Sequence, residues 1–342
     1  MVELNGKKIL VTFLMHLGDL TLTTPFIHAL RKAAPDAHIT MLVDEKLKDV
    51  VLFNPYLDEV VTIDKKGRDN SILSLWACSR HLSKLDFDVL INLHPNERCS
   101  FIDAMTSVKL RTGTTHKIFK WFWDVFTPLD RSMHAADMYL DVLQQLGVQD
   151  LRNNGLEIFP GEEHFLEAEL FWQEQNITDQ DKLIGFNIGS AVPTKRWPPE
   201  RFAEVADIFA AKGYKTVFFG GPMDEEMVAE ATGYMQTRPI IATGHFAIGG
   251  LAAAMRRCCL IITNDSGPMH VAISQKVPIV AMYGPSNPKL YGPYTKDAVI
   301  VTAQPPCQGC ADGMKHSCDD LQCMSRMTVE QVVAAAEKML EK

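Results

Sequence analysis

The segment 264–270 (NDSGPMH) has the residue types best suited to chemistry in this sequence. It lies between an apolar run typical of a buried strand and a run typical of a helix. Backbone N–H groups at a helix start are unpaired and lie at the positive end of the helix dipole, so they suit a phosphate. Asp265, Ser266 and Gly267 are therefore candidate ligand-binding residues, and His270 lies one turn into the helix. The alternative is an ordinary connection that Asp265 or Ser266 caps.

A second turn, at 189–198 (GSAVPTKRWP), has related chemistry. It offers the hydroxyl of Ser190 and the charge of Lys195, which can neutralise a phosphate. A third turn, at 220–226 (GGPMDEE), has glycines that allow close approach to the backbone and carboxylates that can accept ribose hydroxyls. Each turn alone could be a surface loop with a capping residue. Together they favour a nucleotide-binding site.

Asp19 is the candidate catalytic residue in the first half of the chain. It follows the apolar run 7–14 (KKILVTFL), which predicts a buried parallel strand. Open α/β sheets bind ligands at the carboxyl ends of their strands, and a carboxylate there could act as a general base. The alternative is helix capping. The next helix begins either at Thr24 and Pro25 or near Gly18 with a kink at Pro25.

The stretch 98–131 interleaves basic and aromatic residues, with Lys117 and Lys120 among the basic ones. Such a mixture suits a membrane interface or an anionic, lipid-linked ligand. A segment that packs its aromatic side chains on the core is the alternative.

Four of the eight cysteines cluster at Cys307, Cys310, Cys318 and Cys323. Because disulfides are disfavoured in the cytoplasm, the cluster indicates either structural zinc or a packed thiol-rich loop. Its spacing fits zinc poorly, because only one CxxC is present.

Strand patterns and helix patterns alternate along the chain and position these residues. Such alternation predicts parallel sheets with helices on both faces. In the second half, strands are expected at 183–188, 215–219, 259–263, 278–283 and 297–301. A polar segment with glycine and proline before residue 162 indicates a domain boundary. We therefore predict α/β architecture with two Rossmann-like domains across a cleft: residues 1–160 and 161–327, followed by a C-terminal helix at 328–342.

Composition narrows the function classes. The chain has 342 residues, 46% of them hydrophobic, and a net charge of −8, most of it after residue 155. The negative charge argues against general nucleic-acid binding. No apolar run reaches the ~20 residues needed to span a bilayer, and the N-terminus lacks the apolar core of a signal peptide. A cytoplasmic location is expected.

The ordered motifs resemble those of the ADP-heptose:lipopolysaccharide heptosyltransferases. They are Gly18-Asp19 and Thr24-Pro25 after the first strand, KRWP at 195–198, GGPxD at 220–224 and DSGPxH at 265–270. The resemblance covers nearly the whole chain and implies an inverting glycosyltransferase of the two-Rossmann-domain GT-B type. ADP-heptose would bind the C-terminal domain. The acceptor, lipid A–Kdo or a heptosylated lipopolysaccharide core, would bind the N-terminal domain, with peripheral contact at the inner membrane and Lys117 and Lys120 as acceptor contacts.

The resemblance also implies roles for residues. Asp19 would take the proton from the acceptor hydroxyl as it attacks the anomeric carbon. Lys195 and the N–H groups of Ser266 and Gly267 would stabilise the departing ADP, so that no metal or other cofactor is required.

Further roles are implied for the donor site. Asp224 or Glu225 would hold the ribose, Phe246 would lie near the adenine, and His270 would orient the phosphate turn. One departure is Ala191, which replaces the second of two hydroxyl residues common before the lysine segment.

Three other functions remain open. One is a transferase of the same fold that uses another nucleotide sugar or acceptor. Another is a sugar-nucleotide epimerase, which needs additional acid and base groups for which His16 and His94 are candidates. The third is a non-catalytic nucleotide-sugar-binding protein.

Overall fold

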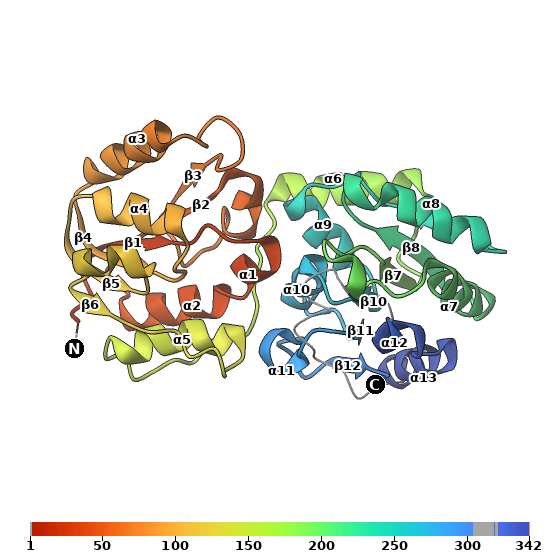
Figure 1. Ribbon diagram of the computed structural model, residues 1–342. Coiled ribbons are helices and arrows are strands. Elements are labelled where there is room, and N and C mark those ends of the chain that lie inside the picture. Colours follow the sequence, from red (N-terminus) through yellow and green to blue (C-terminus); the bar gives the residue numbers. More distant parts are fainter. Residues whose placement is uncertain (1, 304–317, 319–320, 342) are drawn as a thin grey trace. The chain divides into compact units, whose positions relative to one another are not determined.

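The computed structural model describes residues 2–303, 318 and 321–341. The chain divides into two compact units, the N-terminal unit (Met1–Phe159) and the C-terminal unit (Pro160–Lys342). Within the described residues, each unit contains one parallel sheet of six strands between layers of helices (Figure 1). None of the described helices is long and apolar enough to cross a membrane.

The sheet of the N-terminal unit has the strand order β3-β2-β1-β4-β5-β6, with parallel neighbours. The chain adds strands on one side of β1 and then, from β4 onward, on the other side. The carboxyl ends of β1 and β4 therefore meet at a topological switch point, where open α/β sheets bind ligands. The strands are β1 (Lys8–Thr12), β2 (His38–Asp44), β3 (Glu59–Ile63), β4 (Phe87–Asn92), β5 (Val108–Gly113) and β6 (Val125–Phe126).

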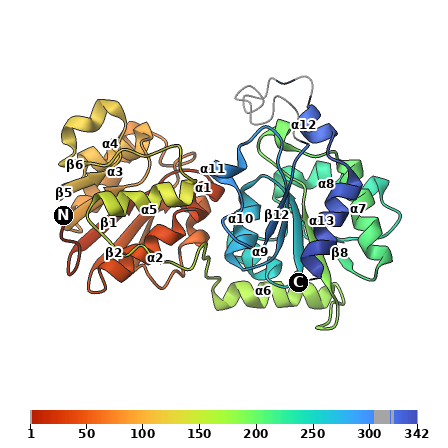
Figure 2. The ribbon, with the colours of Figure 1, turned by 90° about the horizontal axis from the view of Figure 1, so that it is seen from below.

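Helices cover both faces of this sheet, which explains why β1 and β4 are almost continuously apolar and buried. α2 packs beside α5 on one face, and α3 packs beside α4 on the other (Figures 1 and 2). The helices are α1 (Leu17–Thr21), α2 (Thr24–Ala33), α3 (Ile72–Ser83), α4 (Glu97–Met105) and α5 (Ala135–Gln145), with the 3-10 helices η1 (Glu45–Val50) and η2 (Lys117–Phe122).

The C-terminal unit repeats this plan with the order β12-β11-β10-β7-β8-β9, so that β7 and β10 form the central pair. The carboxyl ends of β7 and β10 thus mark the switch point of the second sheet. The strands are β7 (Leu183–Asn187), β8 (Lys215–Phe219), β9 (Ile240–Ile241), β10 (Leu260–Asn264), β11 (Ile279–Met282) and β12 (Ala298–Val301).

The helices of the C-terminal unit form two groups: α9 contacts α6 and α10, and α7 contacts α8 and α13. α13 also contacts β10, β11 and β12, and its buried side chains join the core of this unit. The helices are α6 (Glu162–Glu174), α7 (Pro199–Ala211), α8 (Glu225–Tyr234), α9 (Ile248–Met255), α10 (Gly267–Ser274), α11 (Pro288–Tyr291), α12 (Gln322–Ser325) and α13 (Val329–Leu340), with the 3-10 helices η3 (Pro193–Lys195) and η4 (Pro222–Asp224).

The predicted fold class is confirmed, and the structure decides between the two predicted starts of the helix after β1. The segment after β1 forms two separate helices, α1 and α2, with Thr23 at the N-cap of α2 and Pro25 in its first turn. This agrees with the predicted alternative in which a helix begins at Thr24 and Pro25, because a proline lacks an N–H group and fits the first turn. The cap is Thr23 rather than Thr24, and the residues before it form the separate short helix α1. The stretch 98–131, which mixes basic and aromatic residues, contains most of α4, and β5, η2 and β6.

Candidate functional site

Two asparagine side chains organise the switch point of the C-terminal unit. Asn187 ends β7, and its amide donates hydrogen bonds to Thr263 Oγ1 (3.0 Å) and Ser266 Oγ (2.8 Å). Asn264 ends β10, and its amide donates to Ile188 O (2.7 Å) and accepts from Trp197 N (3.1 Å). These bonds tie the turns at 189–198 and 264–270 together beneath the sheet edge.

Lys195 and Asp265, which are 70 positions apart in the sequence, form an ion pair in the C-terminal unit. Lys195 Nζ lies 2.7 Å from Asp265 Oδ2, and the same oxygen accepts a bond of 2.5 Å from Ser286 Oγ. The two side chains are 14% and 6% exposed. Since a lysine has three N–H donors, this pair holds the ammonium in place while leaving donors that can reach a ligand.

Ser266 is the N-cap residue of α10, and its backbone is extended (φ −155°, ψ 168°). Its hydroxyl accepts the hydrogen bond from Asn187, and within the described structure it makes no capping bond to the helix. α10 begins at Gly267 with a proline in its first turn. The first turn therefore has the geometry of an anion-binding helix start.

Ser190 is buried beside this helix start. Its hydroxyl accepts a hydrogen bond from Val192 N (3.3 Å) and lies 3.5 Å from Asp265 O. The next cation, Arg196, donates from Nε to Ser190 O (2.9 Å). The structure thus brings Ser190 and Lys195 of one turn next to Asp265 and Ser266 of the other. Their role in binding a phosphate stays a prediction.

Asp224 links the second and third turns. Its carboxylate accepts a hydrogen bond from Gly221 N (2.9 Å) and lies so close to Gly189 that a Cβ at that glycine would meet Asp224 Oδ1 at 2.1 Å. Glu225 is exposed beside Gly244, where an added Cβ would lie 2.7 Å from Glu225 Oε1. Glycine at these positions therefore allows the carboxylates to approach the neighbouring backbone.

Phe246 lies in an aromatic cluster at the start of α9. Its ring centroid is 5.0 Å from that of Phe171 on α6 and 4.6 Å from that of His245. Phe246 is half-buried and His245 is exposed. His270 is buried within α10 and is 4% exposed. The adenine and phosphate-turn roles of Phe246 and His270 remain predictions.

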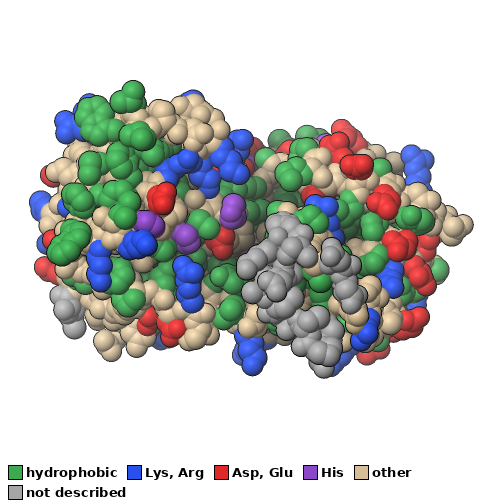
Figure 3. All heavy atoms as spheres, viewed as in Figure 1, with side chains coloured by type: hydrophobic (Ala, Val, Ile, Leu, Met, Phe, Trp, Pro, Cys, Tyr) green, Lys and Arg blue, Asp and Glu red, His purple; other side chains and the backbone are tan. Residues whose placement is uncertain are grey.

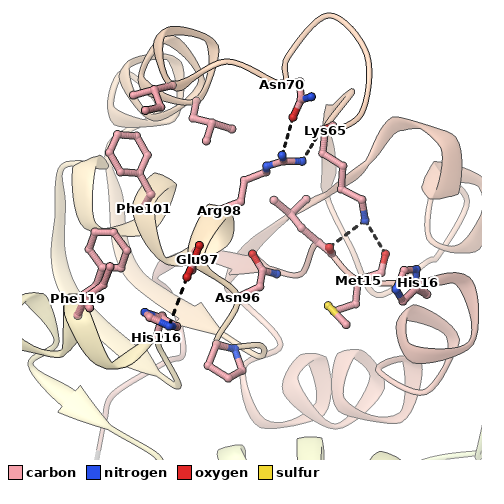
Figure 4. A pocket seen from close by; sticks show the side chains of 15 residues that line it. Met15, His16, Lys65, Asn70, Asn96, Glu97, Arg98, Phe101, His116 and Phe119 are labelled. Atoms are coloured by element: carbon pink, nitrogen blue, oxygen red, sulfur yellow. Dashed lines mark hydrogen bonds and ion pairs between the residues drawn. The ribbon is translucent and has the colours of Figure 1, made fainter. Parts of the chain in front are cut away.

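Asp19 lies in the first turn of α1 and is partly buried. The segment that leads to it from β1 includes Met15 and His16, which line a pocket of about 780 Å³ in the N-terminal unit (Figure 4). The prediction that Asp19 follows the ligand edge of the first strand agrees with this placement. Its role as a base stays a prediction.

Lys65 and Arg98 form the cationic side of this pocket. Lys65 Nζ donates to Leu14 O (2.9 Å) and Met15 O (2.8 Å) and lies 3.1 Å from Asp44 Oδ2. Arg98 donates to the backbone oxygen of Lys65 and to Asn70 Oδ1 (2.6 Å) (Figure 4). Both cations are thus fixed by polar partners at the pocket wall.

The opposite wall of the pocket is apolar. It comes from α3, α4 and η2, which contribute Ile72, Leu75, Phe101, Ile118 and Phe119. His116 completes the wall, and its Nε2 lies 3.7 Å from Glu97 Oε1. The pocket therefore suits a ligand with both anionic and apolar parts.

Lys117 and Lys120 do not line this pocket, although their neighbours on η2 do. Both lysines are exposed, and Lys120 Nζ lies 4.5 Å from the centre of the Phe126 ring. The acceptor role of these two lysines stays a prediction, and the structure places them next to residues that line the pocket rather than in its wall. Lys65 and Arg98 lie 33 positions apart, and no sequence motif joins them.

A buried carboxyl group supports the ends of β1 and β4. Asp103 Oδ2 on α4 accepts hydrogen bonds from Thr12 Oγ1 (2.9 Å) and Asn92 Nδ2 (2.6 Å). Burial raises the pKa of Asp103 to about 7. Nearby, burial and then the charge of Arg131 lower the pKa of His94 to about 4, so that His94 is neutral at pH 7. Sequence reasoning missed Asp103, which lies inside a helix without a motif.

The cysteine cluster lies partly outside the described residues, because Cys307 and Cys310 belong to the segment that is not described. Cys318 is half-buried, and Cys323 is buried in the core of the C-terminal unit. In the described part of the chain, no three His, Cys, Asp or Glu side chains are grouped as metal ligands. The zinc hypothesis remains untested.

Two units with the same doubly wound sheet, one of them with phosphate-suited turns, define an α/β fold of the two-domain GT-B type. The model of glycosyltransferase family 9 (heptosyltransferase) matches residues 75–318, and the chain belongs to this family. The resemblance in the sequence is thereby confirmed, and the protein is a glycosyltransferase.

Similar proteins agree with this assignment. A solved glycosyltransferase of family 9 from Veillonella parvula is 53% identical, with a TM-score of 0.95 and 99% of each chain covered. Lipopolysaccharide heptosyltransferase 3 of Escherichia coli K12 is 25% identical, with 94% of this chain and 95% of that protein covered. The structure of ADP-heptose lipopolysaccharide heptosyltransferase II of Escherichia coli has a TM-score of 0.81 at 21% identity, with 98% of each chain covered.

Proposed function

We propose that the protein transfers L-glycero-D-manno-heptose from ADP-heptose to the inner core of lipopolysaccharide, with inversion at the anomeric carbon. The observation that carries the proposal is the Lys195–Asp265 pair beside the first turn of α10. It supplies a positioned cation and a helix start for a diphosphate. The choice of sugar and acceptor is supported by the family and by the similarity to lipopolysaccharide heptosyltransferases.

The donor site follows from the C-terminal unit. Lys195 and the N–H groups of Ser266 and Gly267 would stabilise the charge that develops on the departing ADP. Fixed donors of this kind usually contribute most to catalysis. Because these groups supply positive charge, the proposed reaction requires no metal. Asp224 or Glu225 would accept the ribose hydroxyls.

Asp19 is the proposed general base. As the acceptor oxygen forms a bond to the anomeric carbon, the bond from that carbon to the ADP oxygen breaks. The hydroxyl proton passes to the Asp19 carboxylate, and the leaving electron pair stays on ADP. The charges therefore balance without a redox partner.

The pocket of the N-terminal unit is the proposed acceptor site. Lipid A–Kdo and heptosylated core carry carboxylate or phosphate groups, and Arg98, which keeps N–H donors beyond its bonds to Lys65 O and Asn70, is placed to bind them. The Lys65 ammonium is already bonded to Leu14 O, Met15 O and Asp44, so it adds positive charge to the pocket wall without a free donor. Lys117 and Lys120 lie on the same segment as His116 and would contact the acceptor from outside the pocket. Such an acceptor is membrane-bound, so we also propose a cytoplasmic protein in peripheral contact with the inner membrane.

The test is ADP release from ADP-heptose, with and without a Kdo–lipid A acceptor, in the presence of EDTA. We expect acceptor-dependent release that falls roughly a hundredfold or more in Asp19→Asn, the scale of a general base. Asp179→Asn, at an exposed position of the C-terminal unit, is the matched control.

Two results would contradict the proposal. Undiminished release by Asp19→Asn would remove Asp19 as the base. No release with any core acceptor would refute the heptose assignment and favour a transferase for another nucleotide sugar. Epimerisation of a nucleotide sugar without acceptor would point to the epimerase alternative, which membership of family 9 disfavours.

A further inference from the structure

α3 has an unusual outward face. The helix is apolar on its buried side, where Leu75 and Leu82 join the core of the N-terminal unit. Yet Ile72 and Leu73 are 73% and 77% exposed, and Trp76 is also exposed. A helix that packs on a core by one face normally shows polar side chains on the other. The first half of α3 therefore presents an apolar surface to its surroundings.

A second exposed apolar segment lies on the other side of the pocket. On η2, Trp121 is 96% exposed, and Ile118 and Phe122 are exposed beside it. Both segments reach the same pocket, because Ile72 and Ile118 line it. Between them lies α4, which contacts both α3 and η2. Hydrophobic side chains gather over α3 and α4 in the space-filling view (Figure 3).

We call these six exposed side chains the apolar rim of the pocket: Ile72, Leu73, Trp76, Ile118, Trp121 and Phe122. Large apolar side chains that are exposed on two segments beside one pocket indicate a site of interaction. Tryptophan is the residue type enriched where an apolar medium meets water.

The charges on the two segments that carry the rim are positive, although exposed carboxylates lie nearby at Asp86 and Asp124. Neither α3 nor η2 contains an aspartate or glutamate. The second half of the outward face of α3 carries Arg80 and Lys84 just beyond the apolar half, and η2 carries Lys117 and Lys120. The exposed carboxylate at the pocket, Glu97, faces His116. Clustered lysine and arginine next to apolar side chains attract anionic lipid headgroups.

We propose that the apolar rim inserts into an anionic lipid surface and holds the pocket at the level of the headgroups. The partner is the bilayer itself, because apolar and tryptophan side chains stand beside cations on two separate segments around one opening. This inference deepens the proposed function, since it rests on an acceptor that is itself a membrane lipid. The inference assigns the membrane contact chiefly to α3, a helix that has no part in the proposed transfer reaction.

The experiment is co-sedimentation of the full chain with vesicles of equal parts phosphatidylethanolamine and phosphatidylglycerol, and with vesicles of phosphatidylcholine alone. The double variant Leu73→Ser/Trp76→Ser removes two rim side chains that do not line the pocket. The matched control is Leu166→Ser/Leu170→Ser, which removes two exposed leucines from α6 in the C-terminal unit. Arg80→Ser/Lys84→Ser tests the charges separately.

We expect the wild type and the α6 control to bind the anionic vesicles. The rim variant should bind about tenfold more weakly, because it loses apolar area that lipid would cover. The charge variant should also bind the anionic vesicles more weakly. Added salt should weaken vesicle binding by the wild type until it is close to that of the charge variant. ADP release with a deacylated, water-soluble acceptor should be unchanged in the rim variant.

Absence of wild-type binding to anionic vesicles would overturn the proposal. Equal losses of vesicle binding in the rim variant and the α6 control would also overturn it, because they would indicate nonspecific adsorption of apolar side chains. So would the finding that the rim binds a protein and not vesicles. Rim-dependent vesicle binding by a chain that releases no ADP from ADP-heptose would support the lipid surface while refuting the proposed sugar donor.

Discussion

At the scale of single residues, the Lys195–Asp265 pair holds the lysine ammonium in a defined position. A lone lysine on a loop would have to be ordered by the ligand, and that ordering reduces binding free energy. Here Asp265 and Ser286 hold the ammonium before any ligand arrives. Burial and the neighbouring Asp265 also raise the pKa of Tyr283 well above its usual value, so that this hydroxyl stays neutral.

Lys195→Gln tests the proposed stabilisation of ADP. We expect kcat for ADP release to fall roughly 10²–10³-fold, the scale for removal of one transition-state donor. Lys212→Gln is the control, because Lys212 is exposed and pairs with Glu337. Similar kcat values in wild type and Lys195→Gln would show that the charge on ADP is stabilised elsewhere.

Asp103 predicts a pH dependence of stability. Its pKa of about 7 in the folded protein is well above the ~3.9 of an unfolded chain. Between these values the folded state holds a proton that the unfolded state has lost, so the contribution to stability is lost as pH rises through 7.

Asp103→Asn removes this titration and keeps an oxygen acceptor. We expect the free energy of unfolding of the variant to rise relative to wild type between pH 5 and pH 8, by roughly 3 kcal/mol, most of it below pH 7. Urea unfolding at the two pH values measures the difference, with Asp179→Asn as an exposed control. An offset that stays constant with pH would show that Asp103 is ionised throughout.

At the scale of elements, the end of β5 depends on one glycine. Gly113 has φ +91°, and an added Cβ would lie 2.2 Å from the backbone oxygen of Asn92 on β4. Gly113→Ala should therefore destabilise the N-terminal unit by ~3 kcal/mol or more, since backbone atoms must move.

Gly213 provides the matched comparison, because it has φ +90° but no atom within 4 Å of the added Cβ. Gly213→Ala should lower the free energy of unfolding by only ~1 kcal/mol, the usual strain of a left-handed alanine. Thermal unfolding of the two variants measures both effects. Equal losses would mean that backbone conformation, and not the contact with β4, sets the requirement at Gly113.

At the scale of the whole molecule, the repeated sheet gives each unit its own ligand edge. We expect ADP to slow hydrogen exchange at 189–198 and 264–270 in the C-terminal unit. A soluble acidic acceptor fragment should instead protect α4 and η2 in the N-terminal unit. Hydrogen-exchange mass spectrometry measures both patterns, and protection by ADP at α4 and η2 would reverse the proposed assignment of donor and acceptor.

Much of the scaffold could be predicted because the local pattern decides it. Central strands such as β8 and β10 are covered on both faces, so they are continuous apolar runs that differ from their surroundings. The edge strand β6 and the alternating strand β5 were missed, because partly exposed strands mix charged and apolar residues. Their pairing with the neighbouring strands, rather than their composition, makes them strands.

By itself, the sequence determined the fold class, the three turns of the C-terminal unit and the position of Asp19 after the first strand, because each depends on residues close together in the chain. Only the tertiary structure decided that Lys195 is held by Asp265, that Lys65 and Arg98 line one pocket, and that α3 exposes its apolar side chains. These features join residues that are distant in the sequence, or depend on which face of a helix is covered. Hydrophobic periodicity alone does not specify either of them.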